Sequence, residues 1–404
     1  MALLKSSLFG GKEARPRNGD PMSLMQDSHV VEGKTPQNTS QSAYQREDFS
    51  HSPMLVFYEV TRACNLKCVH CRADAQRYCH PEELTPHQSL QLITQLTTFP
   101  KPPLLVLTGG DPMKRRDIFS IIAHARREGL EVAMTPSATQ LVTTAAIRQL
   151  RASGLHRLAV SLDGADEKTH DDFRRVPGSF ERTLRIISDA AAVELPVQIN
   201  TTLCQHNLHQ IEAMAELLDT LPIVMWSVFF LIPTGRGMAQ QRLTPLEVEA
   251  AFARLYAQMG RRKYAIKTTE APHFRRYVMQ QSQENPEARA RITAMGASAA
   301  GGASRLVGTN DGKGVMFVSH IGEISPSGFL PIVCGRFPND SVVDVYQKSP
   351  LFVDLRNPDK LTGKCRRCEF REFCGGSRAR AHAVTGDPLA AEPDCVYIPP
   401  ACRT

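Results

Sequence analysis

Short apolar runs alternate with amphipathic segments along residues 53–240. Runs typical of buried strands occur at 54–60, 104–107, 132–135, 157–161, 197–202 and 223–231. Between them, apolar residues spaced three and four apart predict helices at 89–98, 118–127, 144–152, 180–192 and 207–218. Six strand–helix units in succession predict an α/β fold with a parallel sheet and right-handed crossovers.

The flanking segments have other patterns. Residues 1–50 are polar and lack periodicity, which predicts a disordered tail before an α/β domain at 51–240. Residues 241–300 predict a helical bridge, with helices at 245–258 and 286–295. Residues 301–404 predict a small α+β domain with short strands at 314–319 and 322–325 and a cysteine-rich end.

Composition narrows the class of protein. The 404 residues are 42% hydrophobic and 22% charged, as in ordinary globular proteins. A net charge of +7 without a basic block gives no reason to expect nucleic acid as a partner. The sequence has no apolar run of membrane-spanning length and no signal-peptide core, so no membrane association is expected. Eleven cysteines in such a chain predict metal binding in the reducing cytoplasm rather than disulfides.

Three cysteines directly follow the first predicted strand, as Cys64-x3-Cys68-x2-Cys71. A [4Fe–4S] cluster normally takes four thiolates, so three would leave one iron open to an outside ligand. A zinc site is the alternative, but zinc needs four ligands and no matching pair follows closely. Chance spacing is the remaining interpretation.

This motif, with His70 before the last cysteine, resembles that of the radical SAM enzymes. The resemblance implies a partial (β/α)6 barrel with its chemistry at the carboxyl ends of the strands. It also implies a [4Fe–4S] cluster on Cys64, Cys68 and Cys71. In that family the open iron binds S-adenosylmethionine (SAM), which one electron cleaves to a 5′-deoxyadenosyl radical.

The resemblance further implies a set of SAM contacts, most of them at the ends of predicted strands. Gly109-Gly110-Asp111-Pro112 resembles the family's GGEP motif, and Ser161-Leu-Asp163-Gly resembles its ribose-contact segment. The other expected contacts are His70 against adenine, Thr135, Ser137, Asn200, Thr202, and Arg236 in a Gly-Arg-Gly segment. Ordinary turns and loop caps are the alternative interpretation of these residues.

A second cysteine group occupies the C-terminal end, at Cys365, Cys368, Cys374 and Cys395. Its spacing alone fits zinc and iron–sulfur equally. The order CRRCEFREFCGGSRARA resembles the SPASM domain and implies one auxiliary [4Fe–4S] cluster for electron transfer, hence two clusters in all. Arg378 stands where a further cysteine is expected, and the cysteine pair expected near 305–320 is absent. Cys334 is predicted to be a buried unliganded thiol, and Cys79, Cys204 and Cys402 have no pattern.

The CGGSRARA run and the following Thr385-Gly-Asp387-Pro most resemble the tetrapyrrole-modifying branch of that family. That branch includes enzymes that act on propionate side chains in haem biosynthesis. Peptide or protein maturation by thioether or carbon–carbon crosslinking stays an alternative. A non-catalytic iron–sulfur carrier or regulator is another, although a carrier needs no SAM pocket. A low-potential donor of the flavodoxin or ferredoxin type is the expected partner of the enzyme.

Substrate residues are predicted from one segment rich in ionisable side chains. It supplies two cations, an acid and an imidazole suited to propionates: Glu270, His273, Arg275 and Arg276. A solvated helix start after Pro272 explains the same pattern equally well. Arg378 and Arg380 could also bind carboxylates, or could only offset the charge of the auxiliary cluster.

Overall fold

The computed structural model describes residues 45, 47–284 and 308–403. The chain divides into two units, Met1–Ser42 and Ala43–Thr404, and only the second contains described residues. Most of the predicted tail and the predicted helix at 286–295 lie outside them. At the end of that tail, Glu47–Ser50 form a 3-10 helix, η1, and Phe49 is buried, so disorder is the wrong prediction for these four residues.

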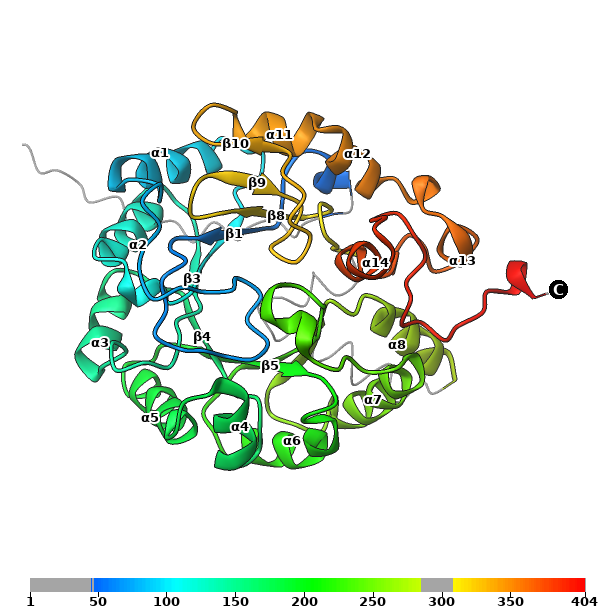
Figure 1. Ribbon diagram of the computed structural model, residues 1–404, viewed down its shortest axis with the longest axis horizontal. Helices are drawn as coiled ribbons and strands as arrows, with labels where there is room; N and C mark the ends of the chain where they lie inside the picture. The colour runs from blue at the N-terminus through cyan, green and yellow to red at the C-terminus, as the bar shows by residue number, and fades with distance from the viewer. Residues whose placement is uncertain (1–44, 46, 285–307, 404) are drawn as a thin grey trace, which may run out of the picture. The chain divides into compact units, whose positions relative to one another are not determined.

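One ten-stranded sheet organises this unit, in the order β10-β9-β8-β1-β2-β3-β4-β5-β6-β7 (Figure 1). The six predicted strands are present and pair in parallel in chain order. They are β1 (Leu55–Glu59), β2 (Leu104–Thr108), β3 (Val132–Met134), β4 (Arg157–Ser161), β5 (Val197–Leu203) and β6 (Met225–Phe230). The predicted partial barrel of the α/β class is confirmed.

Helices surround the strands on the outside (Figure 1). They are α1 (Pro86–Leu96), α2 (Ile118–Arg127), α3 (Thr144–Ala152), α4 (Glu167–Arg174), α5 (Ser179–Ala191), α6 (Ile211–Asp219), α7 (Pro245–Gln258) and α8 (His273–Glu284). Thr85 and Thr244 begin α1 and α7 with capping boxes, each satisfying backbone N–H groups that would otherwise lack partners. The sequence therefore fixes the residue at which each of these two helices begins.

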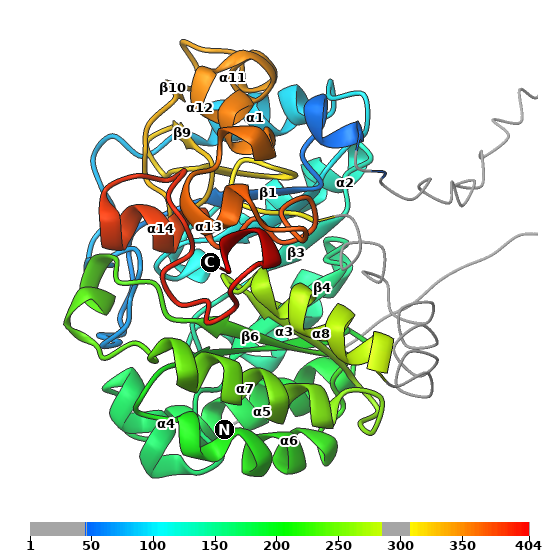
Figure 2. The same cartoon turned by 90° about the vertical axis from the view of Figure 1, so that its right-hand side faces the viewer.

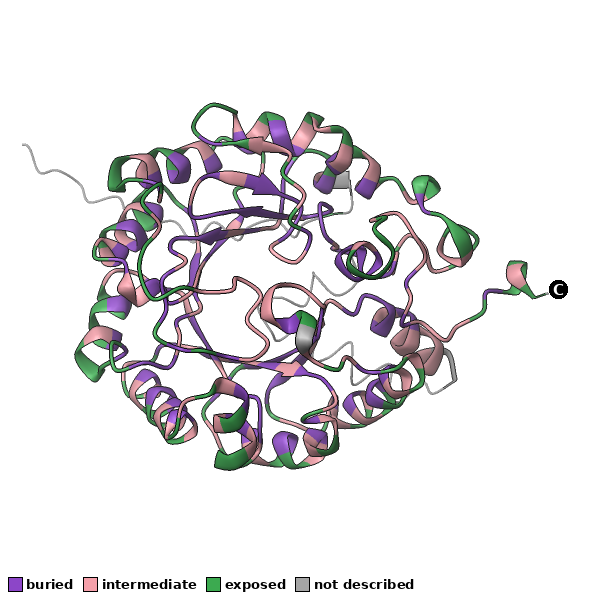
Figure 3. Cartoon of the chain, viewed as in Figure 1, coloured by how far each residue is buried: buried purple, intermediate pink, exposed green. Residues whose placement is uncertain are grey.

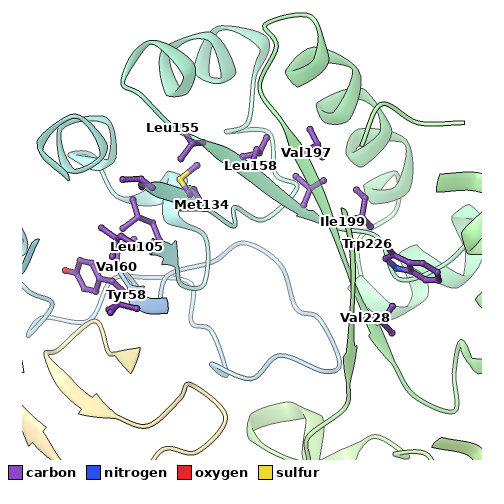
Figure 4. Close-up of a cluster of buried hydrophobic side chains, with 14 of the residues drawn as sticks. Tyr58, Val60, Leu105, Met134, Leu155, Leu158, Val197, Ile199, Trp226 and Val228 are labelled. Carbon is purple, nitrogen blue, oxygen red and sulfur yellow. The ribbon is translucent and has the colours of Figure 1, made fainter. Parts of the chain in front are cut away.

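The core lies between the sheet and the helices. Strand residues such as Tyr58, Leu158 and Val228 are fully buried and project into it (Figures 3 and 4). Trp226 is also buried and donates its indole N–H to Thr201 Oγ1 at 2.8 Å. Continuous apolar runs in these strands match burial on both faces of a parallel sheet.

Residues 241–284, expected as part of a helical bridge, also contain a strand. β7 (Ala265–Thr269) pairs in parallel with β6 and extends the barrel sheet. The C-terminal segment likewise continues that sheet, because β8 (Val315–Val318) pairs in parallel with β1. β9 (Glu323–Ser325) and β10 (Gly335–Arg336) follow in antiparallel pairs. The sheet thus connects the barrel to the cysteine-rich end.

The remaining described helices are α11 (Val342–Lys348), α12 (Pro350–Arg356), α13 (Gly363–Arg366) and α14 (Arg378–Thr385). Short 3-10 helices are η2 (Pro112–Lys114), η3 (Leu208–Gln210), η4 (Gly235–Ala239), η5 (Pro358–Lys360) and η6 (Pro400–Cys402). Figure 2 shows α11–α14 gathered on the β8–β10 side of the sheet. Within the described ranges, every helix is too short or too polar to cross a membrane.

Candidate active site

The loop after β1 brings three cysteines to one cavity of about 180 Å³. Cys64 and Cys68 are buried and Cys71 is half-buried, and all three line it. Predicted contact residues from the ends of the other strands line the same cavity: Gly109, Gly110, Thr135, Ser137, Ser161, Thr202 and Arg236. The structure therefore brings together segments more than a hundred residues apart in the sequence.

Two glycines let the loop after β2 lie directly on the cysteine loop. A Cβ on Gly109 would stand 2.4 Å from the carbonyl oxygen of Thr61, and one on Gly110 would stand 2.5 Å from that of Ala63. The backbone N–H of Gly110 donates to the Thr61 carbonyl at 2.9 Å. Only glycine permits this approach, which explains the Gly-Gly pair physically.

Arg236 fastens the cysteine loop from the other side. Its Nε donates to the Cys68 carbonyl at 3.0 Å, and its Nη1 pairs with Asp74 at 2.9 Å. Its Nη2 is buried and has no hydrogen-bond partner among the residues described. Arg236 thus holds the loop and leaves one buried N–H donor unpaired among the described residues, while its contact with a carboxylate stays a prediction.

Gly235→Ala is expected to disrupt this site. Gly235 has φ +55°, and a Cβ there would lie 2.3 Å from the Arg72 carbonyl and 2.5 Å from that of Cys71. We expect the free energy of unfolding to fall by about 3 kcal/mol or more, with less iron bound after reconstitution. Chemical denaturation and iron analysis measure both.

Gly386→Ala is the matched control, because Gly386 has φ +81° but nothing lies within 4 Å of the added Cβ. It should lose only about 1 kcal/mol and no iron. Equal effects of the two substitutions would contradict the close approach of η4 to the cysteine loop.

Asp111 acts behind the cavity rather than in it. The buried carboxylate accepts hydrogen bonds from the Ser137 N–H at 3.3 Å and from Thr139 Oγ1 at 2.8 Å. Burial raises the pKa of Asp111, and the bond from Thr139 opposes this rise. Ser137 Oγ in turn lies 3.4 Å from Cys64 Sγ. Asp111 therefore positions the β3 loop against the first cysteine.

Asp163 has the same kind of role at the end of β4. Its carboxylate pairs with Arg174 at 2.5 Å and accepts the Thr202 N–H at 2.7 Å. Arg174 Nη1 also lies 3.6 Å from Cys68 Sγ, so the pair places a cation beside a cysteine. Four predicted contact residues do not line the cavity: Asp111, Pro112, Asp163 and Asn200. Their direct contact with SAM stays a prediction. Asn200 accepts a hydrogen bond from Gln198 instead.

His70 lines the cavity as part of a stack of three rings. It stacks on Phe173 with centroids 4.1 Å apart, and Phe173 stacks on His206 at 5.1 Å. Burial lowers the pKa of His70 well below its usual value, so the imidazole is neutral. Because Phe173 covers one face, a ligand such as adenine can use only the other.

His170 supports the loop after β4 in its neutral form. Its Nδ1 accepts the Asp163 N–H at 3.0 Å, and burial lowers its pKa from 6.5 to about 4. Between pH 6.5 and about 4, His170 therefore binds a proton in the unfolded chain but not in the folded chain. The titration of His170 must therefore lower the free energy of unfolding by about 3 kcal/mol as the pH falls through that window.

His170→Asn should remove that part of the acid sensitivity. Urea unfolding of the cluster-free chain at pH 7 and pH 4.5 measures it for the original and the substituted chain. The original chain is expected to lose more stability between the two pH values. Parallel losses in both would contradict a buried neutral His170.

Sequence reasoning missed several residues of the cavity, of which Arg72 is the most connected. Arg72 pairs with Glu59 at 2.8 Å, donates to the Gly328 carbonyl at 3.2 Å and lies over the Phe317 ring at 4.9 Å. His320 Nδ1 also lies 2.8 Å from a carboxylate oxygen of Glu59. The position of Arg72 directly after Cys71 was the available signal. Arg72 joins the cysteine loop to the β8–β9 region.

The other missed lining residues include Arg174, Phe229 and Phe329.

The four C-terminal cysteines also lie near one another. Burial raises the pKa of Cys368 to about 11 and that of Cys374 further, and Cys365 and Cys395 add to both rises. Backbone N–H groups point at two of the sulfurs, from Gly376 to Cys374 at 3.4 Å and from Glu392 to Cys365 at 3.3 Å. Such donors stabilise thiolates, so the group suits a metal centre.

Across the described part of the chain, no three His, Cys, Asp or Glu side chains converge on one metal position. A [4Fe–4S] cluster binds each thiolate through a different iron, so its ligands stand further apart than those of zinc. An all-thiol donor set is the usual ligand set of iron–sulfur clusters.

The other four cysteines are free thiols that belong to neither group. Cys334 is half-buried, packs against the main core and lies 3.5 Å from the Ile332 carbonyl. Cys204 is buried, Cys79 is exposed and Cys402 is half-buried.

The predicted substrate residues lie by the second cysteine group rather than at the cavity. Arg275 donates to the Phe373 carbonyl, Arg276 pairs with Glu249, and Glu270 accepts from Ser377 Oγ at 2.7 Å. Buried His273 packs on Phe252. The cavity is not lined by these four residues. Each of the four has a partner within the fold, and their role in substrate binding stays a prediction.

Arg378 and Arg380 are also engaged. Buried Arg378 donates to the carbonyls of Pro388 and Ala390, and buried Arg380 pairs with Glu392 and Asp394. Both guanidinium groups therefore already bind partners within the fold.

Comparison with known proteins decides the family. Residues 58–218 match the model of the Radical SAM superfamily. The AdoMet-dependent heme synthase of Methanosarcina barkeri is 37% identical over 350 residues, covering 87% of this chain and 98% of that protein. This chain belongs to the radical SAM superfamily.

A second AdoMet-dependent heme synthase, from Nitratidesulfovibrio vulgaris, is also 37% identical and covers 87% of this chain and 95% of its own. The crystal structure of Streptococcus suis SuiB shares the fold, with a TM-score of 0.65 at 16% identity over 86% of this chain and 78% of that one. The protein is thus a radical SAM enzyme, and a [4Fe–4S] cluster and SAM are its cofactors. The carrier interpretation is set aside.

Proposed function

We propose that this radical SAM enzyme modifies propionate side chains of a tetrapyrrole. The observation that carries the proposal is the 37% identity to an AdoMet-dependent heme synthase over 98% of that protein's length. The cavity supports it, because Phe229 and Phe329 offer apolar rings 6.3 Å apart beside the cationic Arg72 and Arg236. Aromatic surface suits a flat macrocycle, and guanidinium groups suit carboxylates.

Cys64, Cys68 and Cys71 would hold the catalytic [4Fe–4S] cluster, with SAM beside it. Their fit rests on the donor set, three thiols on one loop, and on the glycine contacts that shape the cavity. With both groups bound, the site supplies a 5′-deoxyadenosyl radical that removes a substrate hydrogen atom. Proximity of Arg174 to Cys68 would help to neutralise the thiolate charge.

The chain's own residues position the reactants and limit water. The free Nη2 of Arg236 can donate to polar groups of SAM, and the hydroxyl oxygen of Ser137, held by Asp111 and Gly110, can accept from them. Neutral His70, fixed by Phe173, offers a flat face to adenine. Leu231 and Ile232 make one wall apolar. A dry, pre-arranged site of this kind protects a radical from side reactions.

Cys365, Cys368, Cys374 and Cys395 would hold an auxiliary [4Fe–4S] cluster that accepts the electron released by the substrate. Four thiolates leave no open iron, which favours electron transfer over substrate binding. Two observations support this proposal. Cys365 and Cys395 raise the pKa of Cys374, and the N–H groups of Gly376 and Glu392 donate to the sulfurs of Cys374 and Cys365.

A low-potential donor of the flavodoxin or ferredoxin type would supply the electron that starts the reaction. Exposed Arg366 and Arg367 beside the second cysteine group, together with the net charge of +7, favour an acidic redox protein as a partner. Eleven free cysteines favour the reducing cytoplasm as the location. The domain limits 51–240, 241–300 and 301–404 stay proposals.

Incubating the reconstituted enzyme with SAM, reductant and iron-coproporphyrin III tests the substrate. We expect 5′-deoxyadenosine and a porphyrin that has lost propionate carboxyl groups, detected by mass spectrometry. Arg72→Gln should reduce product more than Arg127→Gln, an exposed control on α2. Unchanged porphyrin, with 5′-deoxyadenosine formed only when a candidate precursor peptide is added, would instead support peptide maturation.

A further inference from the structure

Helix α8 places two successive arginines beside the second cysteine group. Arg275 Nη1 donates to the carbonyl of Phe373, the residue before Cys374, at 2.9 Å. Its Nη2 donates to the Thr309 carbonyl at 2.7 Å. Arg276 lies over the ring of Tyr397, two residues after Cys395, at 5.4 Å. Both cations therefore touch the segments that carry the cysteines.

The two arginines differ in how their charge is balanced. Arg276 makes a two-point contact with Glu249, at 2.6 Å from each carboxylate oxygen. Arg275 contacts only neutral oxygens, and no carboxylate of the described residues forms an ion pair with it. Two other cations near this group have partners of their own: buried Arg380 binds Glu392, and half-buried Lys364 donates to the Cys395 carbonyl.

Arg275 is half-buried, and the cost of partly desolvating its cation is not repaid by a carboxylate among the described residues. Burial lowers the pKa of Arg275 to about 10, and Cys374 is the group that opposes this shift. The Arg275 guanidinium therefore lies beside the segment that carries Cys374, with no carboxylate among the described residues to balance its charge. A cluster with four thiolates carries net negative charge, which one more electron increases.

We propose that Arg275 is a positioning residue whose charge compensates the auxiliary cluster and raises its reduction potential. This inference rests on the proposed function of the second cysteine group. After hydrogen abstraction, the carbon–carbon bond to the carboxylate breaks, carbon dioxide leaves, a double bond forms and one electron is released. The acceptor gains one negative charge and no proton, and an external one-electron carrier removes that electron afterwards. A fixed positive charge favours this acceptance.

Three full-length variants separate charge from packing. Arg275→Gln removes the charge, Arg275→Lys keeps it, and the double variant Glu249→Gln/Arg276→Gln removes a neighbouring pair without changing net charge. All are prepared in a chain with Cys64, Cys68 and Cys71 replaced by alanine, so that only the second site titrates. Iron content and the midpoint potential, followed by electron paramagnetic resonance, are the readouts.

Arg275→Gln is expected to make reduction about tenfold less favourable, which is about 59 mV for one electron. Arg275→Lys and the double variant should stay within about threefold of the parent chain. An unshifted potential in Arg275→Gln, or an equal shift in Arg275→Lys, would overturn the role of charge. Loss of the cluster from both Arg275 variants would make Arg275 purely structural and also overturn it. A parent chain without about four irons would instead count against the auxiliary cluster itself.

Discussion

Replacing Cys68 by alanine is expected to abolish SAM cleavage. Cys68 is buried, lines the cavity together with Cys64 and Cys71, and lies 3.6 Å from Arg174 Nη1. Two thiolates cannot hold a cluster that already lacks a fourth. We expect 5′-deoxyadenosine formation to fall by at least about 1000-fold, as for other indispensable groups.

Cys79→Ala is the control for this substitution. Cys79 lies on the same segment but is exposed and is not part of the cavity. The control should retain cleavage and its iron. Survival of SAM cleavage in Cys68→Ala would mean that the catalytic cluster is bound elsewhere.

Replacing Cys374 by alanine is expected to separate SAM cleavage from product formation. Cys374 belongs to the second cysteine group, and the cavity is lined by none of that group's four members. SAM cleavage should stay within about threefold of the original rate, while porphyrin product falls at least about 100-fold. Chromatography of 5′-deoxyadenosine and porphyrins in one reaction measures the ratio.

Cys334→Ala is the matched control, since Cys334 packs against the core apart from the other cysteines. It should form both products in the original ratio. Full product formation by Cys374→Ala would remove the electron-accepting role of the second group. Loss of SAM cleavage in that variant would show that the second group also supports the first.

The sequence predicted the barrel well because most of its strands, such as β2 and β6, are largely apolar runs, while β5 alternates apolar and polar residues. β4 and the helices α2 and α3 match the predicted ranges, since periodicity and caps define their ends. β7 was missed because its sequence, AIKTT, is only half apolar and its last three residues are half-buried. Helix α4 was missed because only His170 and Phe173 of its eight residues are buried.

The candidate site was predicted as a set of strand ends, and the cavity contains most of them. Direct contact was expected for Asp111 and Asp163, yet both turn away to fix neighbouring loops. The sequence shows that a carboxylate is present, but it does not show which N–H groups will donate hydrogen bonds to it. The same limit applies to Arg275 and Arg276, whose partners Phe373 and Glu249 lie far along the chain. Pairing of β8 with β1 is equally non-local.

The most direct test of a two-cluster radical SAM enzyme acting on a tetrapyrrole is one anaerobic experiment. The chain is reconstituted, its iron is counted, and SAM, reductant and iron-coproporphyrin III are added. About eight irons, 5′-deoxyadenosine and a decarboxylated porphyrin are the predicted result. About four irons, or 5′-deoxyadenosine with the porphyrin unchanged, would contradict it.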